Sequence, residues 1–167
     1  MRASRLVLPA LAALTLSLAA CAPPPIYKTG PDTVTASPQA VAHAPEQFQH
    51  REVIWGGRVV KVTNLATKTE IELLGYPLDR SQRPDVGAKP GGRFIAVVPG
   101  YLEPLNFPPG SLMTVAGPIK GMRSGNVGKS AYVFPLVEAN EHHRWTAEEM
   151  RSPWSNVHFG VGIGTAF

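Results

Sequence analysis

The clearest candidate for chemistry is Cys21, the only cysteine of the 167-residue chain. It follows Leu18-Ala19-Ala20, and small residues directly before a cysteine are typical of the site where a bacterial signal peptidase cuts a lipoprotein precursor. The thiol can form a thioether to diacylglycerol, and the amine released by cleavage can then be acylated. The sequence therefore predicts S-diacylglycerol and N-acyl groups on Cys21 and no other cofactor. A free thiol or an intermolecular disulfide is the alternative for a lone cysteine.

The residues upstream of Cys21 have the pattern of a secretory signal. Arg2 and Arg5 precede residues 6–20, which are apolar apart from Thr15 and Ser17 and are too few to span a bilayer, which takes roughly 20 residues. We therefore expect a cleaved signal peptide over 1–20 and a mature protein held in a membrane by acyl chains. Each buried methylene contributes about 0.8 kcal/mol, so two or three chains anchor a protein firmly.

The residue after Cys21 bears on the destination of the protein. In enterobacteria-like systems an aspartate at this position retains a lipoprotein in the inner membrane, and here the residue is Ala22. The sequence therefore favours a lipid-anchored protein of the outer membrane, with its folded part on the periplasmic face.

The remaining candidates for catalysis or metal binding are weaker. Adjacent residues on a strand point to opposite faces, so His142 and His143 are poorly placed to share a metal, and we expect them in a solvated turn with no metal site. Asp79, Asp85 and Glu103 fall in expected loops, where ion pairs with arginines explain them better than paired catalytic carboxylates. No nucleophile elbow or phosphate-binding loop is present. We expect no enzymatic activity.

Basic side chains in or beside the expected loops form a candidate rim for a ligand. If the loops converge, this rim would suit an anionic polymer of the envelope, and the alternative is a scattered, solubilising surface. The whole chain has a net charge of +4, and two of its basic residues precede Cys21. The positive charge that remains after Cys21 is too small to indicate a nucleic-acid partner. The rim residues are Arg80, Arg83, Lys89, Arg93, Lys120, Arg123 and Lys129.

The elements that would position these residues begin after a proline-rich segment. Residues 21–47 contain six prolines, and proline lacks an amide proton and fixes φ. We expect an extended, lipid-anchored linker over 21–47, with no binding role of its own, that lifts the folded part off the membrane.

Residues 48–145 show the alternation of half-buried strands. The expected strands are 53–63, 68–76, 93–98, 112–119 and 131–139, of which the first two form a hairpin. Gly56-Gly57 predicts a bulge or sharp bend in the first strand, and Pro135 predicts an edge or a bulge in the last. Residues 77–92 and 101–110 are expected loops, and 121–129 is an expected glycine-rich turn. Short strands with glycine bends favour an all-β, OB-like Greek-key barrel of five or six strands, with a sandwich as the alternative.

The last segment, 146–167, begins with a helix signal. Thr146 and Glu149 form a capping box, flanked by Trp145 and Met150 as a hydrophobic staple, and Pro153 ends the helix after little more than one turn. Residues 156–167 then alternate apolar residues with glycine, which fits either a final strand or a tail that orders only against a partner.

Several of these motifs, in this order, resemble the Slp family of starvation- and stationary-phase-associated outer-membrane lipoproteins of Gram-negative bacteria. The resemblance is strongest over 48–137 and includes the lipobox at Cys21. It implies a lipoprotein of the outer membrane without known enzymatic activity, and it carries over no catalytic residues. The further motifs are Val53-Ile54-Trp55-Gly56-Gly57, Tyr76-Pro77-Leu78-Asp79, Gln82-Arg83-Pro84, Gly92-Arg93-Phe94, Pro99-Gly100-Tyr101-Leu102-Glu103-Pro104 and Leu112-Met113-Thr114-Val115-Ala116-Gly117.

Two functions follow as expectations. The first is a structural or interaction role in the cell envelope, connected with stress or starvation. The alternative is a ligand-binding barrel that recognises an anionic envelope polymer or a small molecule. A filled barrel would favour the first, and a concave pocket with converging polar groups would favour the second.

Overall fold

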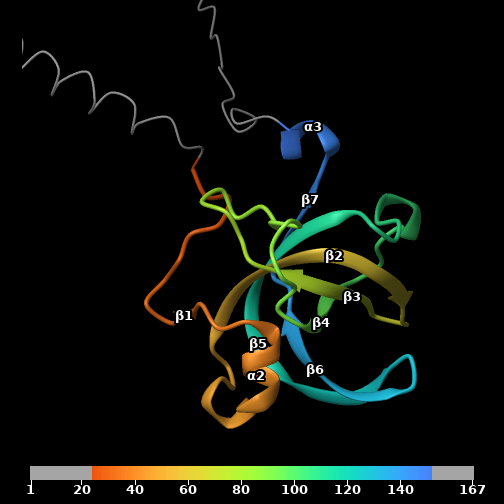
Figure 1. The fold of residues 1–167 in the computed structure, drawn as a ribbon. Coiled ribbons are helices and arrows are strands. Elements are labelled where there is room, and N and C mark those ends of the chain that lie inside the picture. Colours follow the sequence, from red (N-terminus) through yellow and green to blue (C-terminus); the bar gives the residue numbers. More distant parts are fainter. Residues whose placement is uncertain (1–23, 152–167) are drawn as a thin grey trace, which may run out of the picture.

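The computed structural model describes residues 24–151 (Figure 1). Cys21, the cleavage motif before it and the glycine-alternating segment 156–167 therefore lie outside the described residues. The strands are β1 (Thr33–Val34), β2 (Glu52–Asn64), β3 (Lys68–Tyr76), β4 (Arg93–Pro99), β5 (Leu112–Val127), β6 (Ser130–Glu138) and β7 (Glu141–Trp145). The helices are α2 (Pro38–His43) and α3 (Ala147–Arg151), with 3₁₀ turns η2 (Pro45–Gln47) and η3 (Pro104–Asn106).

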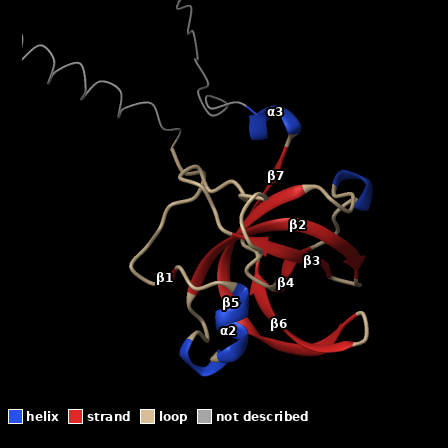
Figure 2. Ribbon diagram, in the orientation of Figure 1, coloured by secondary structure: helices blue, strands red, loops and turns tan. Residues whose placement is uncertain are grey.

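Strands β2, β3, β4, β6 and β5 close into a barrel (Figure 2). The sheet order is β1-β2-β3-β4-β6-β5-β7, and an additional pairing between β2 and β5 completes the ring. Within the ring only the β4–β6 pairing is parallel. This is the Greek-key connectivity of an OB barrel, which confirms the OB-like prediction and excludes the sandwich. β1 and β7 extend the sheet beside β2 and β5.

The barrel interior is filled by side chains. The inward positions of β3 carry Ile71 and Leu73, and both are fully buried together with Phe94 of β4 and Met113 of β5. Trp55 of β2 packs edge-on against Phe94, with ring centroids 5.1 Å apart. Alternation along each strand puts these apolar residues on one face, so the sequence pattern and the core agree.

Gly57 lies where β2 is paired on both sides. Residues 56–58 of β2 are paired with β3 on one side and β5 on the other. A Cβ on Gly57 would lie 2.4 Å from the carbonyl oxygen of Leu74, so only glycine allows this close approach. The register shift between β2 and β3 lies between Val59 and Lys61. The bulge predicted at Gly56-Gly57 is therefore displaced by a few residues.

β5 is much longer than its predicted range. The expected turn over 121–129 is wrong, because residues 121–127 continue β5 and pair with β6. The register shifts between Ile119 and Gly121, and Gly121 has φ +145°, a conformation that favours glycine. The strand thus bends at the glycine and continues, and only Gly128 and Lys129 form the turn.

Pro135 lies in a part of β6 that tolerates a proline. Pro135 is opposite Met122 of β5, and pairing with β4 begins one residue later, at Leu136. The first part of β6 is therefore paired on one side only. The prediction of an edge position for Pro135 is confirmed.

The chain after β6 differs from the expected turn. His142 and His143 lie in β7, opposite Val115 and Thr114 of β5. The prediction of a solvated turn at the two histidines is wrong, because five residues add to the sheet beside β5. The capping box that follows is confirmed: the amide of Thr146 donates to Glu149 Oε2 (2.7 Å), and the amide of Glu149 donates to Thr146 Oγ1 (3.1 Å).

The proline-rich segment packs on the barrel over much of its length. Val41 of α2 is fully buried, and Tyr27 is 8% exposed. Ser37 caps α2, and Pro38 and Pro45 occupy the first positions of α2 and η2, where a missing amide proton is tolerated. The structure therefore differs from the expected extended linker over 21–47. Residues 27–37, here called the strap, cross the outside of the barrel (Figure 1).

Candidate functional site

The N-terminal end of the strap is held by the side chain of Gln82, which bonds both backbone groups of Tyr27. The amide of Tyr27 donates to Gln82 Oε1 (2.7 Å), and Gln82 Nε2 donates to the carbonyl of Tyr27 (2.9 Å). Gln82 is 7% exposed and has φ +66°, a backbone conformation that a non-glycine residue rarely adopts. Gln82, in the loop after β3, thus has an unusual backbone conformation, and in this conformation the Gln82 side chain bonds the strap.

The same loop is bonded to the barrel through Thr114. Thr114 Oγ1 donates to the carbonyl of Gln82 (2.7 Å) and accepts from Nε1 of Trp145 (2.9 Å). The hydroxyl of Tyr27 donates to the carbonyl of Thr114 (3.4 Å). Burial, and then the charge of Glu141, raise the pKa of Tyr27 far above its usual range, so this hydroxyl stays protonated. We call Tyr27, Gln82, Thr114 and Trp145 the clamp.

The middle and the second end of the strap are held by β2 and by Trp55, which is part of β2. Nε1 of Trp55 donates to the carbonyl of Ala36 (2.8 Å), and Thr33–Val34 pair in parallel with Glu52–Val53. The strap is therefore fixed near both ends and at its middle.

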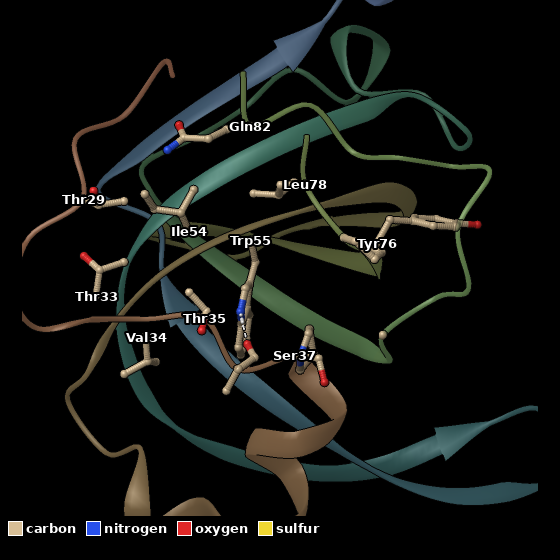
Figure 3. A pocket seen from close by; sticks show the side chains of 14 residues that line it. Thr29, Thr33, Val34, Thr35, Ser37, Ile54, Trp55, Tyr76, Leu78 and Gln82 are labelled. Carbon is tan, nitrogen blue, oxygen red and sulfur yellow. Dashed lines mark hydrogen bonds between the residues drawn. The ribbon is translucent and has the colours of Figure 1, made fainter. Parts of the chain in front are cut away.

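A cavity of about 400 Å³ lies between the strap and the barrel (Figure 3). Ile54 and Trp55 of β2 and Leu78 of the loop after β3 form its barrel side, and Thr29 and the clamp residue Gln82 lie at one end. None of its lining residues is charged. They are Thr29, Thr33, Val34, Thr35, Ala36, Ser37, Pro38, Ile54, Trp55, Tyr76, Pro77, Leu78, Gln82 and Gly91.

Four residues of the predicted basic rim are held in separate ion pairs. Their partners are Asp79 for Arg83 (2.8 Å), Glu72 for Arg93 (2.5 Å), Glu138 for Lys120 (2.5 Å) and Glu70 for Arg123 (2.6 Å). Arg80, Lys89 and Lys129 are exposed. The pairs neutralise much of the rim, and two of the carboxylates, Glu70 and Glu72, belong to β3.

The pair between Glu70 and Arg123 joins β3 to the long β5. Both guanidinium nitrogens of Arg123 donate to the carboxylate, at 2.6 and 2.8 Å. These hydrogen bonds lower the pKa of Glu70, against the effect of its burial, and raise the pKa of Arg123. The arrangement is a structural link.

The other titratable candidates also have structural partners. Asp79 accepts from the amides of Ser81 and Arg83, Asp85 accepts from the amide of Gly87, and Glu103 accepts from the amide of Leu105. Each of these carboxylates orders a turn.

The two histidines face different neighbours. His143 lies 3.1 Å from a carboxylate oxygen of Glu149, and His142 packs against Phe107 with ring centroids 6.2 Å apart. Burial and the neighbouring His143 lower the pKa of His142. Within residues 24–151, no three side chains of metal-binding type gather in one place. No helix in that range is long and apolar enough to cross a membrane.

The clamp and the cavity had no counterpart in the sequence interpretation. Gln82 stands in a polar, proline-containing loop, and Tyr27 stands in a segment that reads as a linker. They lie 55 residues apart, and no local pattern indicates that they meet. Only the alternation of threonine and serine with apolar residues over 33–38 could have suggested a strap with one face against the barrel.

Comparisons with known proteins give one family match and several similar proteins. The model of the outer membrane lipoprotein Slp family matches residues 18–161. An uncharacterized lipoprotein of Escherichia coli, YeaY, is 38% identical over 70% of this chain and 64% of its own length. The outer membrane protein Slp of the same bacterium is 30% identical over 89% of this chain and 80% of its own length. An uncharacterized protein of Haemophilus influenzae is 36% identical over 54% of this chain and 50% of its own length.

The chain thus spans between half and four fifths of these relatives. Among solved structures, a small single-stranded DNA-binding protein of Streptomyces coelicolor matches with a TM-score of 0.37 and 16% identity, over 59% of this chain and 97% of that one.

Proposed function

Because the chain belongs to the outer membrane lipoprotein Slp family, we propose that it is a non-catalytic interaction module of the cell envelope, anchored by acyl chains on Cys21 at the periplasmic face of the outer membrane. Membership of the family supports the location at the outer membrane, and the structure supports the role of the folded part. The role in stress or starvation is part of the same proposal.

The observation that carries the proposal is the filled barrel. Fully buried apolar residues occupy its interior, and four of the largest are Phe94, Ile71, Leu73 and Met113. A barrel that encloses a ligand needs an interior space, whereas a filled barrel presents only its outside. An interaction through the outer surface is therefore favoured over a ligand held inside.

The strap limits how far the outer surface of the barrel can lie from the membrane. Tyr27 is fixed to the barrel by the clamp and is only six residues after Cys21. Six residues span at most about 20 Å, so acyl chains on Cys21 would keep the barrel close to the membrane surface. The module would act on partners in or beside the membrane.

The anionic-polymer alternative receives little support. Arg93 and Arg123 belong to the predicted rim, and both are bonded to carboxylates of β3. A polymer would have to displace Glu72 from Arg93 and Glu70 from Arg123, and the largely buried Glu70 would then lose two hydrogen bonds.

Three measurements test the proposal. Cys21→Ala should yield an unlipidated precursor that no longer partitions into detergent as the wild type does. Chemical crosslinking in living cells, followed by mass spectrometry, should recover envelope proteins with the wild type and far fewer of them with Cys21→Ala. Unchanged detergent partition would refute the anchor, and the absence of any protein partner would refute the interaction role. Digestion of the protein by protease on intact cells would refute the periplasmic orientation.

A further inference from the structure

The cavity under the strap has the features of a site for an uncharged, apolar ligand. Its volume of about 400 Å³ falls in the range of small-molecule sites, and Ile54, Trp55 and Leu78 form an apolar wall on the barrel side (Figure 3). We propose that it binds one acyl chain of a phospholipid from the leaflet in which Cys21 is anchored. This inference rests on the proposed lipid anchor.

The chemistry of the lining sets the class of ligand. No charged side chain lines the cavity, so an ion placed there would lose its hydration without a counter-charge. A methylene chain needs no polar partner and can exchange the bilayer interior for contact with the apolar wall. The lining therefore fits an acyl chain and excludes the charged headgroup, which would stay outside.

The strap places hydroxyl groups beside this apolar wall. Thr29, Thr33, Thr35 and Ser37 line the cavity along with the apolar Val34 and Ala36. Thr33 and Ser37 accept hydrogen bonds from the amides of Gly30 and Ala40, while Thr29 and Thr35 are exposed. Exposed hydroxyls at the edge of an apolar space suit the ester oxygens that join an acyl chain to glycerol, because they can donate to them.

The reach of the chain identifies the membrane as the source. The clamp fixes Tyr27 against Gln82, which itself lines the cavity, and the link from Tyr27 back to Cys21 spans at most about 20 Å. The cavity is thus held near the surface of the leaflet that takes up the acyl chains of Cys21. A phospholipid is the nearest abundant acyl donor in that position.

A phospholipid is favoured over the protein's own acyl chains. Moving a chain of Cys21 into the cavity would exchange burial in the bilayer for similar burial in the cavity, and the anchor of the protein would be weakened. A phospholipid chain makes the same exchange without weakening the anchor. Phospholipids also outnumber the protein in the leaflet, which favours their binding by mass action.

The test uses a photoreactive leucine analogue in cells that make the full-length, lipidated protein. The analogue carries a diazirine and replaces leucine with little change of shape, so Leu78 reports on the cavity. Leu105, which is 85% exposed and does not line the cavity, is the internal control. After illumination, the peptide containing position 78 should carry the mass of a phospholipid, and the peptide containing position 105 should not.

A cavity-filling variant gives the second arm. Ile54→Trp places a larger side chain in the space, and the phospholipid adduct at position 78 should fall by about tenfold or more, because a filled pocket no longer buries the chain. Leu65→Trp, in the exposed turn between β2 and β3, should leave the adduct unchanged. Thermal unfolding of both variants checks that the barrel is intact, and the wild-type adduct decides the result if Ile54→Trp does not fold.

Four results would overturn the inference. They are the absence of a phospholipid adduct at position 78, equal labelling at 105, attachment to the acylated Cys21 peptide, or attachment to a second protein. The membrane fraction of the same cells separates this failure from failure of the proposed function. Protein that is membrane-bound but unlabelled refutes only the acyl-chain site, whereas protein absent from the membrane refutes the anchor and the site together.

Discussion

At the scale of single residues, Gln82 joins the strap to the barrel through three buried hydrogen bonds. Its amide group satisfies both backbone groups of Tyr27, and its own carbonyl accepts from buried Thr114. An unsatisfied buried donor or acceptor costs about 1–3 kcal/mol, so these bonds are expensive to lose. The positive φ of Gln82 is the strain that this arrangement requires.

Gln82→Leu should therefore release the strap. The variant leaves the amide and carbonyl of Tyr27 without partners, and we expect the free energy of unfolding to fall by about 1–3 kcal/mol. Denaturant titration measures this loss, and hydrogen exchange should show faster exchange over residues 27–34. Gln47→Leu, at an exposed position of η2, is the matched control. Equal stability and exchange in the two variants would contradict the role of Gln82.

The pair between Glu70 and Arg123 predicts a pH dependence. Hydrogen bonds from Arg123 lower the pKa of Glu70 from its ordinary value of 4.5, so the unfolded chain binds more protons than the folded chain in acid. The stability from this pair is present above pH 4.5 and is lost as the pH falls through the folded-state pKa. Between pH 7 and pH 3 the unfolding midpoint of the wild type should fall more steeply than that of Glu70→Gln. Parallel curves would show that the pair contributes nothing.

At the scale of elements, the barrel depends on close approach between β2 and β3. Gly57→Ala would place a methyl group 2.4 Å from the backbone oxygen of Leu74, which no rotamer change can relieve. Overpacking of this kind typically costs about 1–3 kcal/mol, and we expect a loss of that size in the free energy of unfolding. Gly30→Ala, whose Cβ would meet nothing closer than 4.0 Å, should be close to wild type in the same denaturation experiment. Similar values for the two variants would refute the packing argument.

Local pattern was sufficient for most strands and insufficient for their ends and neighbours. The range predicted for β3 is correct, because Glu70 to Leu73 alternate charged and apolar residues on two faces. β5 was predicted to end at Ile119, because glycine normally marks a turn, whereas Gly121 lies in a bend that the pairing with β6 sustains. β7 was missed because its five residues form a strand only beside β5.

At the scale of the whole molecule, the segment before β2 is part of the folded unit. A chain that begins at Phe48 lacks the buried Val41 and Tyr27, and it lacks the carbonyl of Ala36 that accepts from Trp55. Each large apolar side chain that loses its burial costs about 1.5–3 kcal/mol, which is a substantial part of the stability of a small domain.

Deletion of residues 22–47 should therefore lower the thermal unfolding midpoint strongly or prevent folding, as measured by circular dichroism of the mature chain. Deletion of residues 22–25 alone removes no buried side chain of the described range, and this variant should retain the wild-type midpoint. An unchanged midpoint in the longer deletion would restore the interpretation of 21–47 as a linker.

The sequence by itself determined the alternation of the main strands, the all-β class, the capping box and the resemblance to the Slp family, because each of these depends on residues close together in the chain or on motifs in a fixed order. Only the tertiary structure decided that Tyr27 meets Gln82, that the strap covers an uncharged cavity, and that Arg93 and Arg123 are paired with β3. These features join residues that are 21 to 55 positions apart. Their pairing follows from how the closed barrel brings its strands and loops together, which no local pattern encodes.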